Sequence, residues 1–314
     1  SEVSVRIVLE ESELKRRLEV IRQTLFNTRE KRVHPYKDDK ILTDWNGLMI
    51  ASLAKAARIL DKEDYKSAAI KAMDFIITKM QNSKGRLLHR YRDGDFSIDA
   101  TLDDYAFIIW GLLELYETTF DVNYLTKANE LQNIQNKYFW DSENYGFFLT
   151  ASDAEKLLTR SKDIYDGAIP SGNSVSLNNL LKLSRLTANS DFEKYANNMS
   201  KSFSDIVGKA PTGTTMMLSG VDFAIGNSSE VIIVGNENSE ETIDIIKKIN
   251  QVFIPNKVVI LKNKNNAKEL EEVAPFTGEY KTDLDKTIVY VCKNHKCNLP
   301  TSNIKTVLEL LNYE

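Results

Sequence analysis

The first two thirds of the chain repeat one pattern, a pair of helix-period apolar stripes joined by a short link, and this repeat limits the fold most. Three such pairs start near residues 45, 104 and 173. In the first pair Met49, Leu53 and Leu60 lie on one helical face, and the partner stripe runs from Tyr65 to Met80. Short links make antiparallel neighbours of the two helices. The repeat predicts a mainly α fold, an α/α toroid of antiparallel helix hairpins.

Residues outside these pairs follow other patterns. A charged helix is expected over residues 11–32, ending before Pro35 because proline disfavours helix in the residue before it. A turn at Asp93-Gly94 predicts a short β-hairpin between Gly85 and Phe96. Residues 146–149 are typical of a strand. Asp61 is expected to cap the second helix of the first pair.

The last third of the chain changes to strand patterns at residues 230–235, 257–261 and 287–292, with helices expected near 240–250 and 303–312. Strand–helix–strand order predicts a small parallel sheet. Two domains are therefore predicted. Residues 1–225 form a helical-hairpin barrel portion, and residues 226–314 form a small α/β segment with parallel strands that packs on the barrel or completes it.

Bulk composition excludes several classes of protein. A net charge of −4 argues against general binding to nucleic acid. No apolar run reaches the roughly 18 residues that a membrane span needs, and the first residues lack a secretory signal, so a cytoplasmic protein is expected. Cys292 and Cys297 lack the CxxC redox spacing, and with His295 they supply only three zinc ligands. No metal site and no cofactor are predicted.

Polar residues lie just before the helix pairs or at their starts. In a toroid the first helices of successive pairs run the same way, so their N-termini gather at one end. That end would collect Asp38, Asp39, Lys40, Asp44, Trp45 and Asn46 from the first pair, Asp103, Asp104 and Tyr105 from the second, and Asp166, Ser171 and Asn173 from the third. The sequence therefore predicts a polar pocket at this end of the array.

The chemistry of this pocket suits a small polar molecule, a sugar above all. Carboxylates and amides bind hydroxyl groups, and an aromatic ring stacks on the C–H face of a sugar. The predicted catalytic residues are Asp44, Asp104, Asp166 and His89, because paired carboxylates or a histidine can act as acid and base. Each carboxylate could instead be a plain helix cap.

The predicted hairpin carries His89 with Arg90 and Tyr91 beside it. We include Arg90 and Tyr91 among the predicted substrate-binding residues. An exposed strand histidine with no catalytic role is the alternative interpretation of His89.

Four motifs resemble the signatures of the YyaL / spermatogenesis-associated protein 20 family, a thioredoxin domain-containing family. They are Lys37–Ile50, Leu102–Phe107, Asp166–Ser174 and Cys292-x4-Cys297-x2-Pro300. Tyr145-Gly146 departs from the paired glycine that this family usually has before Phe-Phe.

The resemblance implies a thioredoxin-like domain followed by an (α/α)6-type barrel similar to six-hairpin glycosidases and N-acylglucosamine 2-epimerases. This sequence has no thioredoxin-like region, so we expect the C-terminal barrel part, an incomplete toroid that self-associates or binds the missing N-terminal half. The function implied is a carbohydrate-active protein, either isomerase or epimerase-like or glycoside hydrolase-like. The alternative is a non-catalytic binding or scaffold module that works with a thioredoxin-like partner domain.

Overall fold

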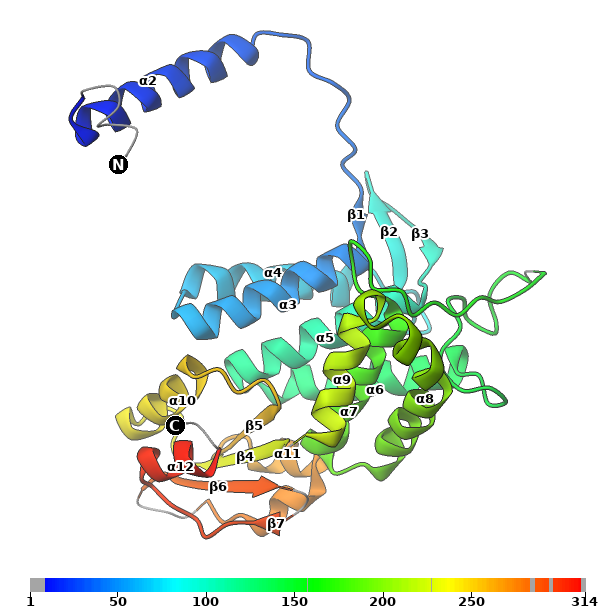
Figure 1. Cartoon of the computed structure of the whole chain (residues 1–314), viewed down its shortest axis with the longest axis vertical. Helices are drawn as coiled ribbons and strands as arrows, with labels where there is room; N and C mark the ends of the chain where they lie inside the picture. Colours follow the sequence, from blue (N-terminus) through cyan, green and yellow to red (C-terminus); the bar gives the residue numbers. More distant parts are fainter. Residues whose placement is uncertain (1–8, 157, 227, 283–285, 294–295, 312–314) are drawn as a thin grey trace. The chain divides into compact units, whose positions relative to one another are not determined.

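The computed structural model describes residues 9–156, 158–226, 228–282, 286–293 and 296–311, and the chain divides into two compact units, Ser1–Lys40 and Ile41–Glu314 (Figure 1). In the first unit, helix α2 (Glu11–Arg29) buries none of its residues. Its charges pair along the helix, as where Arg17 Nε lies 2.7 Å from Glu13. Such i,i+4 pairs stabilise a solvated helix. The predicted charged helix is confirmed.

Three antiparallel helix hairpins make up most of the second unit (Figure 1). They are α3 (Thr43–Leu60) with α4 (Glu63–Lys79), α5 (Leu102–Thr119) with α6 (Val122–Phe139), and α7 (Gly172–Thr187) with α8 (Ser190–Lys209). Helix α9 (Thr215–Ile225) follows. The first helices pack on one another in the order α3, α5, α7, α9, and each partner helix packs on its own first helix. The repeat predicted from the sequence is confirmed.

Each hairpin turns at a residue in the left-handed conformation. Asp61, Phe120 and Ala188 end α3, α5 and α7 with φ of 56°, 55° and 54°. Asp121 and Asn189 then cap α6 and α8 with their side chains. The prediction that Asp61 caps α4 was wrong. Asp61 is instead the C-cap of α3. It adopts the left-handed conformation that commonly ends a helix.

The inner helices approach closely because one of them carries a glycine at the contact. A Cβ on Gly47 of α3 would lie 2.6 Å from the backbone carbon of Phe107 on α5. Helix α5 is buried along most of its length, including Tyr105, Phe107 and Tyr116 at 0% exposure. Glycine at position 47 therefore sets the spacing of the first two inner helices.

A small antiparallel sheet lies beside the start of α3. Its strands are β1 (Ile41–Leu42), β2 (Leu88–Arg92) and β3 (Asp95–Asp99), in the order β1-β2-β3. The predicted hairpin at Asp93-Gly94 is confirmed, and β1 is an addition that the sequence did not indicate. Of residues 146–149, only Phe147 makes a β-bridge, to Trp140, so the predicted strand there was wrong.

The C-terminal sheet has the order β5-β4-β6-β7. Its strands are β4 (Ser229–Val234), β5 (Lys257–Lys262), β6 (Ile288–Lys293) and β7 (Lys296–Cys297). Helix α10 (Glu240–Gln251) connects β4 to its parallel neighbour β5.

The prediction that all these strands are parallel was wrong, because β6 runs antiparallel to β4. Between β5 and β6 the chain passes through α11 (Ala267–Val273) and the short helix η2 (Pro275–Glu279), and it returns on the other side of β4. Helix α12 (Ile304–Leu310) follows β7.

The helices and the C-terminal sheet share one hydrophobic core. The same buried cluster contains Leu112 and Leu180 from the helices and Ile232, Ile260 and Cys292 from the sheet. The predicted domain boundary at residue 225 thus lies inside a unit with a common core, and its status as a domain boundary stays a prediction.

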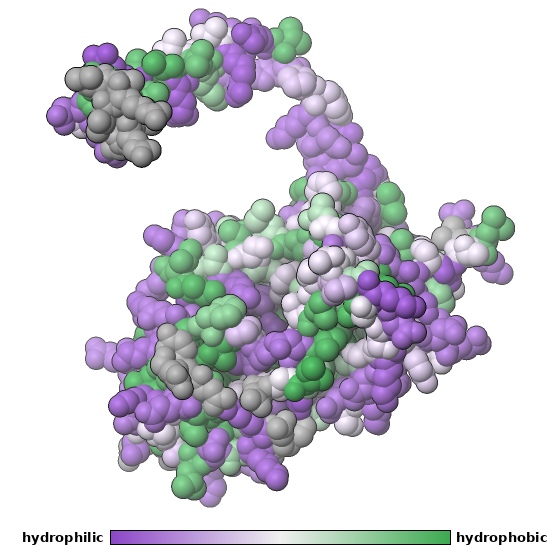
Figure 2. Space-filling model, in the orientation of Figure 1, coloured by the Kyte–Doolittle hydropathy of each residue, from purple (hydrophilic) through white to green (hydrophobic). Residues whose placement is uncertain are grey.

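On the face drawn in Figure 2, hydrophilic residues cover much of the surface and hydrophobic residues lie in separate patches. Within the described residues, no helix combines the length and apolar character that a membrane crossing needs.

Candidate active site

The carboxylate of Asp104 joins three segments at the start of the inner helices. It lies in the first turn of α5 and is 0% exposed. Its Oδ2 accepts a hydrogen bond from the backbone N of Thr101 at 2.7 Å, which completes a capping box at the helix start. Its Oδ1 accepts from the backbone N of Asp44 at 3.0 Å. Asp104 therefore caps its own helix and ties down the start of α3.

His89 on β2 bonds to the same carboxylate. Its Nδ1 lies 2.9 Å from Asp104 Oδ1 and 3.1 Å from Oδ2, and 24% of its side chain is exposed. This hydrogen bond raises the pKa of His89 above its ordinary value, although burial opposes the shift. Because a carboxylate can only accept, Nδ1 carries the hydrogen and Nε2 is the nitrogen left for a ligand.

The position of His89 follows from the small sheet. Strand β2 pairs with β1 through Leu42 and Arg90, and α3 begins directly after β1. Thr43 Oγ1 also donates to the carbonyl oxygen of Leu88 at 2.5 Å. These contacts fix the histidine strand against the start of α3.

Asp44 is the second carboxylate of this cluster. It is 9% exposed, and its Oδ1 accepts from the backbone N of Trp45 at 2.7 Å. Burial raises the pKa of Asp44, and the charge of Asp104 raises it further. Asp44, His89 and Asp104 each offer a ligand atom, and these atoms lie within 4.8 Å of one another. We call these three residues the His–Asp cluster.

Asp103 connects this end of α5 to α7. Its Oδ1 lies against Gly172, where a Cβ would overlap the oxygen. Burial, together with the charges of Asp104 and Asp44, raises the pKa of Asp103 to about 6, and a hydrogen bond from the Gly172 backbone opposes the shift. The predicted gathering of inner-helix starts is thus confirmed for α3, α5 and α7.

Asp166 extends this arrangement to α9 by contacts with backbone amides. Its Oδ1 accepts from Ser171 N at 2.9 Å, and its Oδ2 accepts from Met216 N at 2.8 Å and Met217 N at 3.3 Å. Ser171 caps α7 by accepting from Ser174 N. These contacts give Asp166 and Ser171 structural tasks, and roles in catalysis or binding stay predictions for them.

Asn173 and Tyr105 are fully buried and bond within the protein. Asn173 donates to the carbonyl oxygens of Phe147 and Asp163, at 2.9 Å each, and accepts from Phe147 N at 2.8 Å. The Tyr105 hydroxyl accepts from Arg86 Nε at 3.0 Å. The polar atoms of both side chains thus bond within the protein, and their predicted contact with a substrate is untested.

The remaining predicted binding residues are more exposed. Trp45 is 62% exposed, and Asn46 Nδ2 donates to Leu42 O at 2.8 Å. Arg90 pairs with Asp95, and the Tyr91 ring packs between Phe75 and Phe96.

Asp38, Asp39 and Lys40 belong to the other compact unit, where Lys40 Nζ lies 2.8 Å from Asp38. Their predicted place in the pocket therefore remains a prediction.

The arrangement of the His–Asp cluster suits proton transfer. Hydrogen bonds from Thr101, Asp44 and His89 already occupy both oxygens of Asp104, so this carboxylate orients the histidine. A divalent cation would have to use His89 Nε2 and the remaining lone pairs of the two carboxylates. Acid–base chemistry needs no change in these hydrogen bonds.

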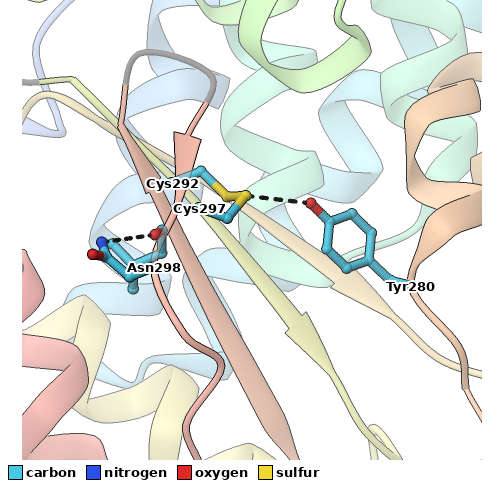
Figure 3. Close-up of a disulfide and its surroundings, with 5 residues drawn as sticks. Tyr280, Cys292, Cys297 and Asn298 are labelled. Carbon is cyan, nitrogen blue, oxygen red and sulfur yellow. Dashed lines mark hydrogen bonds between the residues drawn. A yellow bond between two sulfur atoms is a disulfide. The ribbon is translucent and has the colours of Figure 1, made fainter.

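Two features of the structure were missed in the sequence. Thr101 and Asp104 match the S/T-x-x-D/E capping pattern, which was readable before α5. Cys292 and Cys297 form a disulfide across the β6–β7 pair, and the Tyr280 hydroxyl lies 3.7 Å from Cys297 Sγ (Figure 3). His295, which with the two cysteines would have supplied only three zinc ligands, lies outside the described residues.

Comparison with solved structures defines the class of fold. A cellobiose 2-epimerase from Bacillus thermoamylovorans matches 84% of this chain and 68% of its own, with a TM-score of 0.50 and 13% sequence identity. A D-mannose isomerase matches 53% of this chain and 41% of its own, at a TM-score of 0.43 and 18% identity. The fold is mainly helical and of the six-hairpin glycosidase-like class.

Sequence comparison gives the family. Spermatogenesis-associated protein 20 of Rattus norvegicus is 31% identical over 299 residues, which are 92% of this chain. The Homo sapiens protein is 30% identical over the same length. The chain belongs to the spermatogenesis-associated protein 20 family, and it spans 38% of the length of these relatives. No protein-family model matches it.

Proposed function

We propose that this chain forms part of the active site of a sugar isomerase or epimerase. In this site His89 transfers a proton, and Asp104 holds the His89 ring in its orientation. The observation that carries the proposal is the 2.9 Å hydrogen bond from His89 Nδ1 to Asp104 Oδ1 at the gathered helix starts. Because Nδ1 holds its hydrogen in that bond, Nε2 accepts a proton from a carbon atom next to a carbonyl group.

Asp44 is the proposed general acid. Burial and the charge of Asp104 raise its pKa, so this carboxyl group keeps its proton more readily than an exposed aspartate. Asp44 gives a proton to the carbonyl oxygen while His89 removes one from carbon, and an enediol results. When the enediol turns over His89 and C2 takes the proton on its opposite face, the epimer forms and Asp44 takes back the proton of the C1 hydroxyl. When C1 takes the proton instead, the isomer forms and Asp44 takes the proton of the C2 hydroxyl. Atoms and charge balance without a cofactor.

A second candidate is glycoside hydrolysis, favoured by one observation. The pKa of Asp103 is raised to about 6, mainly by burial, and such a carboxyl group can protonate a leaving oxygen near neutral pH. A third candidate is a non-catalytic module for a thioredoxin-like partner domain. It draws support from the relatives, of whose length this chain spans 38%.

The test incubates the protein with mannose, glucose and cellobiose in deuterated water and follows exchange at C2 by proton NMR. The proposal expects exchange, and His89→Gln lowers its rate by about 10²–10⁴-fold, the usual contribution of a general base. His34→Gln is the matched control, because His34 is exposed on the other compact unit.

The outcomes separate the candidates. Release of glucose from cellobiose without exchange supports hydrolysis. If a chelator abolishes the exchange and a divalent cation restores it, the His–Asp cluster is a metal site. If the chain neither turns over a sugar nor gains melting temperature with one, while a thioredoxin-like domain binds it, the scaffold candidate replaces the proposal.

A further inference from the structure

A buried charge cluster lies toward the other ends of the inner helices. Glu114 of α5 is 1% exposed and accepts from Arg58 Nη2 at 2.5 Å and from Lys182 Nζ at 3.0 Å. Trp110 Nε1 also donates to it, at 3.1 Å. Arg58 Nη2 reaches Glu117 Oε2 at 3.1 Å as well. Helices α3, α5 and α7 each contribute charge to this cluster.

A cavity of about 90 Å³ borders the cluster, between the helices and the segment that leads from α10 to β5. Its charged lining residues are Lys55, Arg58, Glu117, Lys182 and Lys257. When the neighbouring Glu114 is counted as well, the site has four cationic side chains and two carboxylates. The cavity therefore has an excess of two positive charges in a partly desolvated place, which favours an anion.

Lys257 is one source of this positive excess. Its Nζ donates to the carbonyl oxygen of Ile254 at 3.2 Å, and a carbonyl group does not neutralise an ammonium group. Burial lowers the pKa of Lys257, and the charges of Arg58, Lys182 and Lys55 lower it further against the attraction of Glu117. A negatively charged ligand in the cavity would stabilise the charged form of Lys257 and would raise its pKa again.

Glu117, which lines the cavity, has a carboxylate oxygen that accepts no hydrogen bond from the described residues. Glu117 is 7% exposed, and its Oε1 is buried with no hydrogen-bond partner among the described residues. A buried acceptor left unpaired costs free energy. A ligand that fits must therefore carry negative charge and also a hydrogen to donate.

We infer that this cavity binds a phosphate group, with its oxygens accepting from Lys55, Lys182 and Lys257 and a P–OH donating to Glu117 Oε1. Monohydrogen phosphate offers acceptors and a donor on one small tetrahedral ion. Sulfate has the same shape and charge near neutral pH but carries no hydrogen. The pair of anions therefore separates the contribution of Glu117 from that of the lysines.

This site is distinct from the His–Asp cluster. Asp44 and Arg58 are both on α3 and fourteen residues apart, about 20 Å along a helix that rises about 1.5 Å per residue. A neighbouring cavity of about 440 Å³ shares Arg58 and Asn250 with it. That space can hold the remainder of a phosphorylated metabolite, so the phosphate group can be free or part of an ester. An ester would bind as its monoanion, which keeps the one P–OH that donates to Glu117.

Calorimetric titration with inorganic phosphate, at ionic strength held constant with sodium chloride, tests the site. We expect binding, with Lys257→Gln and Lys55→Gln each weakening it by at least about fivefold, the effect of about 1 kcal/mol. Lys194→Gln removes a charge from an exposed pair with Asp191 and should leave the affinity unchanged. Lys55 is on the exposed side of α3, so its variant is expected to fold if Lys257→Gln does not.

Sulfate and Glu117→Gln complete the test. The wild type should prefer phosphate to sulfate, and Glu117→Gln, whose amide can donate, should narrow or reverse this preference. Tighter binding of glucose 6-phosphate than of phosphate identifies an ester as the ligand, and equal or weaker binding identifies free phosphate. No phosphate binding up to about 10 mM, or equal affinity in folded lysine variants and wild type, overturns the inference.

Discussion

The carboxylate of Asp103 lies against the backbone of Gly172, and this contact buries a charge between α5 and α7. Burial first, then Asp104 and Asp44, raises the pKa of Asp103 from 3.8 to about 6. The folded state therefore holds this proton more tightly than the unfolded state. The resulting stabilisation is complete below about pH 4 and is lost as the pH rises through about 6.

An asparagine at position 103 does not ionise, so Asp103→Asn avoids the loss of stability at high pH. The amide oxygen can still accept the hydrogen bond from the Gly172 backbone. We expect the substitution to raise the free energy of unfolding at pH 8 by about 1–2 kcal/mol, a value reduced for partial solvent exposure, and to have little effect near pH 4. Urea unfolding at the two pH values measures this. An equal change at both would show that packing, not ionisation, is responsible.

The His89–Asp104 pair predicts opposite pH trends for stability and turnover. The hydrogen bond to Asp104 raises the pKa of His89, so the protonated pair stabilises the fold below the ordinary histidine value of 6.5 and loses this effect as the pH rises past the raised pKa. The free energy of unfolding of the wild type relative to His89→Gln should fall as the pH rises from about 6.5 through the raised pKa of His89. Sugar turnover should rise over the same range, because only neutral His89 is a base. Parallel trends would contradict the assigned roles.

Gly47→Ala tests the close contact of α3 and α5. The added Cβ would meet the backbone of Phe107, which cannot rotate away as a side chain can. We expect a loss of about 3 kcal/mol in thermal or urea unfolding, typical of overpacking a core contact. Gly208→Ala on α8 is the control, since nothing lies within 4 Å of its added Cβ. That change should be neutral or stabilise the helix by up to about 1 kcal/mol.

Reduction of the Cys292–Cys297 disulfide should destabilise the second unit modestly. The bond closes a loop with a sequence separation of 5 residues, and a loop this short constrains the unfolded chain by about 2 kcal/mol. A reducing agent should therefore lower the melting temperature by a few degrees. Cys297→Ser should melt at the lower temperature with or without the reductant. Thiol titration under denaturing conditions, before and after reduction, should reveal two new thiols.

The common core predicts the result of truncation at the expected domain boundary. Ile232, Ile260 and Cys292 pack in one cluster with helical residues, so a chain ending at Ile225 would expose apolar surface. It should aggregate or bind a hydrophobic dye. Removal of residues 1–40 is the control, because described residues of that segment bury no side chain. This shorter chain should unfold in a single transition, and two separate transitions would favour the boundary at residue 225.

The sequence predicts the helix pairs and the gathering of their starts for a physical reason. Each hairpin is specified locally, by an apolar stripe and a short link, and successive inner helices must run the same way. Asp44 and Asp104 are sixty residues apart, yet the repeat brings them together. The pairing of His89 with Asp104 could also have been predicted, because the hairpin that carries His89 lies directly before α5 in the sequence.

Long-range contacts without a local pattern could not be predicted. The Asp166 carboxylate accepts a hydrogen bond from the backbone N of Met216, fifty residues later in the chain. No sequence pattern near either residue predicts this bond. The direction of β6 depends on the path of the chain between β5 and β6, which strand patterns do not encode. The basic cavity likewise depends on Lys257, which approaches the helices only through the sheet.

The place of β4 in its sheet has a consequence for synthesis on the ribosome. Both neighbours of β4 come later in the chain, and the antiparallel one ends at Lys293. The helix hairpins therefore emerge first, with the apolar faces that will cover the sheet still open to water. Until the last strands leave the exit tunnel, the nascent chain exposes apolar segments of the kind that chaperones bind.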